Sequence, residues 1–158
     1  WPRLRPKWGP TAAATSGLRQ HNRHTCECKT RIKQSIINNE FKDKFEAYSA
    51  GSNPSGKINE DIKEFLKKNK NYDLSGYNSK NFEDFLNNKI KMDHVVTVCN
   101  NANNEVCPIW PKKSQIIHWD IEDPVSKLKD ANNEEKQIII RNTFNNINTK
   151  INNWLNEK

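Results

Sequence analysis

Apolar residues recur at helical spacing in residues 31–41, in residues 58–66 and, with the clearest period, in residues 140–155. Steps of three and four residues place such side chains on one face of a helix, so each stretch predicts an amphipathic helix. Asn59 stands before the second stretch and is followed by two acidic residues, as expected of an N-cap. A further helix is predicted to begin at Ser79, where a serine cap precedes the acidic residues of SKNFEDFL.

Short apolar or β-branched runs separate these helices and predict strands. The runs are 45–50 (FEAYSA), 94–98 (HVVTV) and 115–119 (QIIHW). Strands that alternate with helices form βαβ units with parallel pairing. The predicted fold class is therefore α/β, a three-layer α/β/α sandwich around a small, mainly parallel sheet. Such a sheet normally opens with a strand before its first helix, and residues 1–24 show no alternation that would predict one.

Composition changes sharply near residue 25. Residues 1–24 hold three prolines, five basic residues and no acidic residue, whereas the rest of the chain is rich in Asn, Lys and Ile. We therefore predict a basic N-terminal arm over residues 1–24, disordered or foreign to the domain, and a folded domain over residues 25–158. The arm supplies +5 of the net charge of +7, so the domain is nearly neutral and its charge argues against nucleic-acid binding.

The apolar content of the chain bears on its compartment. No stretch approaches the ~20 apolar residues that a membrane span needs. The first twenty residues also lack the continuous apolar core of a secretory signal peptide. We expect a cytoplasmic protein with no membrane partner.

Four cysteines fall in two pairs, Cys26-x-Cys28 and Cys99-x7-Cys107. Neither spacing fits a zinc site, whose paired ligands favour two to four intervening residues, so we expect no metal. Cys99 directly follows the strand predicted at 94–98 and so stands at a carboxyl end, where open α/β sheets bind ligands. The polar loop to Cys107 is flexible enough to bring the two sulfurs to bonding distance. The alternative is a pair of thiols without a function.

Residues 118–124 read HWDIEDP and continue from the last predicted strand. A residue before proline is held out of the helical region, so the Asp123–Pro124 step fixes the carboxylate in a rigid turn. A positioned acid above an anion site can protonate a departing oxygen. The alternative is an ordinary helix start, with Asp123 as its cap and Pro124 in the first position. A lone histidine is a weak signal, and His118 is expected to be a packed or surface residue.

Four segments, taken in order, resemble the thioredoxin-coupled arsenate reductases, which share the low-molecular-weight protein tyrosine phosphatase fold. They are AYSAGSNPSGKIN (47–59), DLSGYNSKNFEDF (73–85), HVVTVCNNANNEVCPIWP (94–111) and IHWDIEDP (117–124). The last helix is similar too, so the resemblance covers about residues 30–158. The VTVC…CP and HW…DP motifs are specific to the arsenate-reducing branch rather than to phosphatases in general.

The resemblance implies reduction of arsenate to arsenite by a relay of three thiols, with thioredoxin as the external reductant and no tightly bound cofactor. In the family, a cysteine at the start of a C-x5-R loop attacks bound arsenate. A second thiol then releases arsenite, and a third takes over the disulfide, which thioredoxin reduces. Carried over by position, Cys99 matches the second thiol, Cys107 the third, and Asp123 the acid of the Asp-Pro step.

The first thiol is where the chain departs from the family, because no C-x5-R exists in the sequence. Alignment back from YSAG puts Arg23 at the nucleophile position, Cys28 at the inner cysteine and Lys29 at the anion-binding arginine. The nearest substitute is Cys26-x4-Arg31, one residue short. The candidate entry thiols are therefore Cys26 and Cys28, and the candidate anion ligands are Lys29 and Arg31. A shortened cradle without glycine binds an oxyanion poorly, which predicts impaired activity.

Two alternative functions stay open. A low-molecular-weight phosphotyrosine phosphatase would use Cys26 or Cys28 as nucleophile and Asp123 as general acid, but it leaves Cys107 without a role. A catalytically inactive binding protein would keep the scaffold and contact acidic partners through the basic arm, with salt-sensitive affinity.

Overall fold

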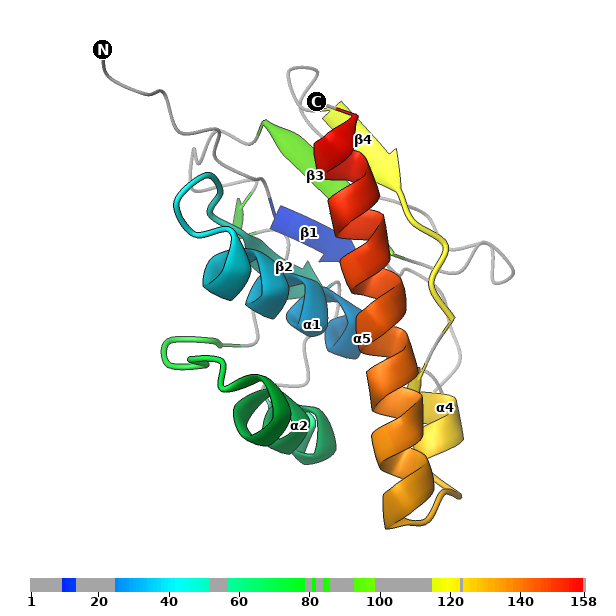
Figure 1. The fold of residues 1–158 in the computed structure, drawn as a ribbon. Coiled ribbons are helices and arrows are strands. Elements are labelled where there is room, and N and C mark those ends of the chain that lie inside the picture. The colour runs from blue at the N-terminus through cyan, green and yellow to red at the C-terminus, as the bar shows by residue number, and fades with distance from the viewer. Residues whose placement is uncertain are drawn as a thin grey trace.

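The computed structural model describes residues 10–13, 25–51, 57–78, 81, 84–85, 93–98, 115–122 and 124–157. The elements follow one another as β1 (Pro10–Ala13), α1 (Thr25–Glu40), β2 (Tyr48–Gly51), α2 (Glu60–Lys70), β3 (His94–Thr97), β4 (Gln115–His118), α4 (Pro124–Leu128) and α5 (Asn133–Asn156) (Figure 1). Helices are interspersed with strands that pair in parallel, which confirms the predicted α/β class. Within these ranges, no helix has the length and apolar character to cross a membrane.

The strands form two parallel pairs. β1 pairs with β2 in the register Pro10↔Tyr48, and β3 pairs with β4 in the register His94↔Gln115. β1 also contacts β3, so the strands lie in the order β2, β1, β3, β4. Parallel strands need a crossover connection, and α1 supplies it between β1 and β2. The result is the βαβ arrangement that the alternation of elements predicts.

Strand β1 corrects the expectation that residues 1–24 contain no strand. Its sequence is PTAA, four residues without alternating apolar positions, so its local pattern carries no strand signal. The pairing with β2 and the contact with β3 are long-range interactions, and these override the weak local preference. Pro10 is tolerated because it is the first residue of the strand. The predicted boundary after residue 24 stays a prediction, with β1 on the N-terminal side of it.

Helix α1 lies at the centre of the packing. It contacts β1, β2, α2, α4 and α5, and every residue from 28 to 37 is buried. In Figure 1 it crosses α5 on one face of the strands. The predicted apolar stripe of Ile32, Ile36 and Ile37 is at most 1% exposed. Because the helix has neighbours on several sides, its polar residues are buried together with its apolar ones.

Helix α5 follows its predicted period closely. Ile140, Phe144, Ile147 and Ile151 are at most 1% exposed and belong to the main core, where they meet residues of α1, α2 and β3. The predicted last member, Leu155, is only partly buried and packs against this core. The steps of three and four residues therefore identified the buried face of the longest helix.

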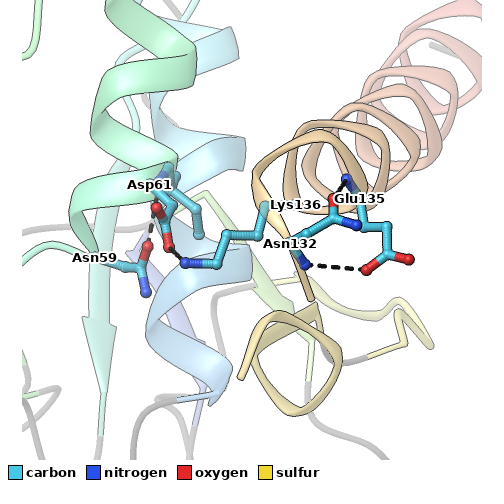
Figure 2. A network of polar contacts seen from close by, with 6 residues as sticks. Asn59, Asp61, Asn132, Glu135 and Lys136 are labelled. Atoms are coloured by element: carbon cyan, nitrogen blue, oxygen red, sulfur yellow. Dashed lines mark hydrogen bonds and ion pairs between the residues drawn. The ribbon is translucent and has the colours of Figure 1, made fainter. Parts of the chain in front are cut away.

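Polar contacts join the starts of α2 and α5. The side chain of Asn59 accepts a hydrogen bond from the third amide of α2, which confirms the predicted cap. At the start of α5, Asn132 accepts from the Glu135 amide at 2.9 Å, and the Glu135 carboxylate accepts from the Asn132 amide at 3.0 Å. This is a capping box. Figure 2 shows Lys136 reaching from α5 to Asp61 on α2, at 3.2 Å.

The capping box yields a stability prediction. Asn132→Ala should lower the free energy of unfolding by about 1 kcal/mol, because the Glu135 amide loses its side-chain acceptor. Urea unfolding followed by circular dichroism measures the change. Asn145→Ala is the matched control, since Asn145 is exposed in the interior of the same helix, where alanine is the better helix former. Equal effects of the two substitutions would contradict the capping role.

Candidate active site

The ends of β3 and β4 bring two predicted site segments to one edge. Because the two strands are parallel, their carboxyl ends lie together, with Thr97 opposite His118. The Trp119 amide donates to the Thr97 carbonyl at 2.8 Å and extends the pairing by one residue. The position of the second predicted thiol follows β3 by two residues, and that of the Asp-Pro acid follows β4 by five. Three predicted site residues lie outside the described part of the chain: Cys99, Cys107 and Asp123.

An anchored histidine lies at this edge. The Nδ1 atom of His118 is 2.9 Å from the hydroxyl oxygen of Thr97, which is buried, whereas His118 itself is exposed. The sequence predicted a packed or surface histidine, and it is a surface one. The Thr97 contact was not foreseen because it depends on the register of two strands that are distant in sequence. This contact holds the imidazole at the carboxyl edge of the β3–β4 pair.

The candidate entry thiols belong to a helix, not to the predicted loop. Helix α1 begins at Thr25, before the predicted start at residue 31, so Cys26 and Cys28 lie in its first turn. Cys28 is buried in the main core one turn before Ile32, which extends the apolar stripe backwards and explains the early start. The side chain of Cys26 lies outside the described residues. A thiol buried among apolar groups is less reactive than an exposed one.

Lys29, the first predicted anion ligand, contacts the segment between β4 and α4. Its side chain is 1% exposed, and its Nζ atom donates to the Ile121 carbonyl at 2.7 Å. Ile121 is two residues before Asp123 in the sequence. Lys29 therefore connects the first helix to the segment that leads to the predicted acid, and its role as an anion ligand stays a prediction.

Arg31, the second predicted anion ligand, contacts the chain that follows α2. Its Nη2 atom donates to the Asn78 carbonyl at 2.6 Å, and its Nη1 atom donates to Gln34 Oε1 at 3.3 Å. Gln34 accepts a further hydrogen bond from the Ser49 hydroxyl of β2 at 2.6 Å. Arg31 thus joins the chain after α2 to α1, and Gln34 joins β2 to the same helix. Its predicted role as an anion ligand also stays a prediction.

Lys33 is a buried residue that sequence reasoning missed. It is fully buried, its Nζ atom donates to the Val96 carbonyl at 3.2 Å, and this atom lies 5.5 Å from the centre of the Trp119 ring. Burial lowers the pKa of Lys33 well below its ordinary value. The spacing of the sequence did contain a signal for this burial. Lys29, Lys33 and Ile37 are four residues apart, so they lie on one face of the helix, and that face is buried.

Comparison with known proteins places the chain in a family. The sequence profile of the low molecular weight phosphotyrosine protein phosphatases matches residues 26–158. The chain belongs to this family. The match begins within α1, so β1 lies N-terminal to it.

Within this family, the chain is similar to arsenate reductases. It is 27% identical over 124 residues to an arsenate reductase of Halalkalibacterium halodurans, covering 78% of this chain and 84% of that protein. A thioredoxin-dependent arsenate reductase of Corynebacterium glutamicum superposes with a TM-score of 0.62 at 18% identity, over all of this chain and 66% of that one. An arsenate reductase in a phosphate-binding state gives 0.62 at 18% identity, over 96% and 97%. At these identities, the structures establish the shared fold.

Lys33 yields a prediction about stability and pH. Lys33→Met should raise the free energy of unfolding at pH 7 by about 1–4 kcal/mol, as replacement of buried charged groups can. Because the folded-state pKa is lowered, the unfolded chain binds more protons between that pKa and ~10.4, so wild-type stability rises with pH there. The difference in free energy of unfolding between Lys33→Met and the wild-type chain should therefore shrink by up to about 1.4 kcal/mol per pH unit.

Urea unfolding of both proteins between pH 7 and pH 10 measures this gap. Lys129→Met serves as the control, since it removes the same charge from an exposed position after α4. A gap that stays constant over the whole range would contradict the lowered pKa of Lys33.

Arg31 yields a prediction that separates its two roles. Arg31→Met should lower the free energy of unfolding by about 1–3 kcal/mol, because Asn78 and Gln34 lose a buried donor. Amide exchange in residues 75–78 should become faster. An anion ligand would instead lose phosphate affinity with stability unchanged, which calorimetric titration with inorganic phosphate detects. Arg141→Met, at an exposed site on α5, should change neither property.

Proposed function

We propose that this chain is an arsenate reductase that converts arsenate to arsenite through cysteine thiols and is regenerated by thioredoxin. The observation that carries the proposal is the parallel pairing of β3 with β4, which directs the segments leading to Cys99 and Asp123 to one edge. The similarity to the arsenate reductase of Halalkalibacterium halodurans supports it. Cys107 favours reduction over simple hydrolysis, because a phosphatase has no use for a further thiol.

The relay balances without another oxidant. The entry thiolate and HAsO4²⁻ take up two protons and give a thiol-bound HAsO3⁻ and water, and we assign delivery of one proton to Asp123. The Cys99 thiolate then attacks the entry sulfur. With two protons, this step yields a disulfide and As(OH)3, so two thiolates supply the two electrons that reduce arsenic. Cys107 next attacks Cys99, which frees the entry thiolate and leaves the Cys99–Cys107 disulfide for the thioredoxin dithiol.

Either Cys26 or Cys28 is the proposed entry thiol. Both lie in the first turn of α1, where the helix dipole stabilises a thiolate and an adjacent oxyanion. Burial of Cys28 opposes its reaction with a solvent-borne anion. No tightly bound cofactor takes part in this scheme, and the cytoplasm is the compartment where thioredoxin is kept reduced.

The proposal predicts arsenate-dependent oxidation of NADPH when the chain is combined with thioredoxin and thioredoxin reductase. Cys99→Ser and Cys107→Ser should each abolish multiple turnover, because each removes one sulfur of the terminal disulfide. Cys107→Ser should still release one equivalent of arsenite and leave the entry cysteine bonded to Cys99, which mass spectrometry of the alkylated protein identifies. Cys26→Ser and Cys28→Ser then show which of the two is the entry thiol.

The same preparation distinguishes the alternatives. Hydrolysis of an aryl phosphate without arsenate turnover, lost in Cys26→Ser or Cys28→Ser, would favour a phosphotyrosine phosphatase. A folded chain that turns over neither compound would contradict the proposed activity and favour the inactive binding protein.

A further inference from the structure

The chain on both sides of Asp123 is held by contacts within the described residues. On the N-terminal side, Ile121 is buried and its carbonyl accepts from Lys29 at 2.7 Å. On the C-terminal side, Pro124 begins α4, whose Pro124 and Leu128 side chains are buried. The residues on both sides of the Asp-Pro step are therefore held in place. On the N-terminal side, the contact comes from Lys29, a side chain of α1.

The contact made by Lys29 is stronger than the ion pair that spans the Asp-Pro step. Glu122 and Lys127 form an ion pair across the Asp-Pro step at 2.8 Å, but their side chains are 74% and 51% exposed. An ion pair so exposed to water contributes little to the stability of the segment. The Lys29 ammonium is almost completely buried, so its short, charge-assisted hydrogen bond to Ile121 is costly to break.

The position of Lys29 suits a tether better than an anion ligand. Its ammonium already donates to a main-chain carbonyl, and only 1% of the residue is exposed to a ligand that arrives from solvent. The sequence made Lys29 a candidate anion ligand from alignment alone. The contact with Ile121 instead connects α1 to the segment that leads to the acid.

We propose that Lys29 is a positioning residue for Asp123: it holds the segment between β4 and α4 through the Ile121 carbonyl, and so sets where the acid stands. This inference rests on the proposed function, whose acid it positions. A catalytic group displaced by about 1 Å can cost on the order of 100-fold in rate. Loss of the tether should therefore lower kcat and leave arsenate binding largely intact.

A double-mutant cycle tests this role. Lys29→Met should lower kcat for arsenate by about 10–100-fold, with KM changed by less than about twofold. Asp123→Asn should lower kcat at least as much, and the double variant should be no slower than Asp123→Asn, because Lys29 acts through the acid. The pH dependence of kcat contributed by Asp123 should be lost in Lys29→Met as well. Lys127→Met, which breaks only the exposed pair, is the matched control.

Besides an unchanged rate, two kinetic results would overturn the inference. A raised KM with kcat unchanged would show that Lys29 binds the anion. A Lys29→Met effect of equal size in the Asp123→Asn background would show that Lys29 acts independently of the acid. Urea unfolding first establishes that each variant folds, and Lys29→Gln, whose amide is too short to reach Ile121, provides a second variant of smaller apolar volume.

The failure of this inference is distinguishable from failure of the proposed function. Absence of turnover with arsenate and with aryl phosphate in the wild-type chain would contradict the function, and the assigned role of Lys29 with it. Wild-type turnover that Lys29→Met leaves unchanged would overturn the inference alone. Amide exchange of residues 119–122 supplies a readout without substrate, since a tether requires faster exchange in Lys29→Met than in Lys127→Met.

Discussion

Helix α1 carries three buried basic side chains that donate to main-chain carbonyls of three separate segments. The pairs are Lys29 with Ile121, Arg31 with Asn78 and Lys33 with Val96. A basic group removed from water needs an acceptor, and an unpaired one is costly. Each contact therefore fixes one segment against the helix: the chain between β4 and α4, the chain after α2, and β3. Two of them, made by Lys29 and Lys33, hold β3 and the segment after β4 against α1.

Two of these contacts involve the predicted anion ligands. Lys29 and Arg31 were candidate anion ligands because of their place in the alignment. In the structure they lie in the buried part of α1, and each donates to a main-chain carbonyl. The basic residues nearest the expected entry thiol thus organise the polypeptide around the site. In the proposed relay, α1 carries the candidate entry thiols, whereas the second thiol and the acid belong to the segments that follow β3 and β4.

Sequence reasoning succeeded where the signal is local and periodic. The α5 stripe from Ile140 to Ile151, the Asn59 cap and the β-branched run of β3 were all readable because each depends on neighbours in sequence. It failed for β1, whose four small residues pair only through distant contacts, and for Lys33, whose burial follows from helices and strands packed around α1. The assignments of Cys99, Cys107 and Asp123 came from motif resemblance, which identifies residue types but not the register that brings their segments together.

The most direct test of this account is a side-chain NMR titration of the chain labelled with ¹⁵N-lysine, using Lys29→Met to assign the Lys29 signal. The account predicts a Lys29 signal that exchanges slowly with water and does not move when inorganic phosphate is added to saturation. Rapid exchange with water, or a shift that follows phosphate binding, would show that Lys29 faces the anion rather than the Ile121 carbonyl, and would contradict the account.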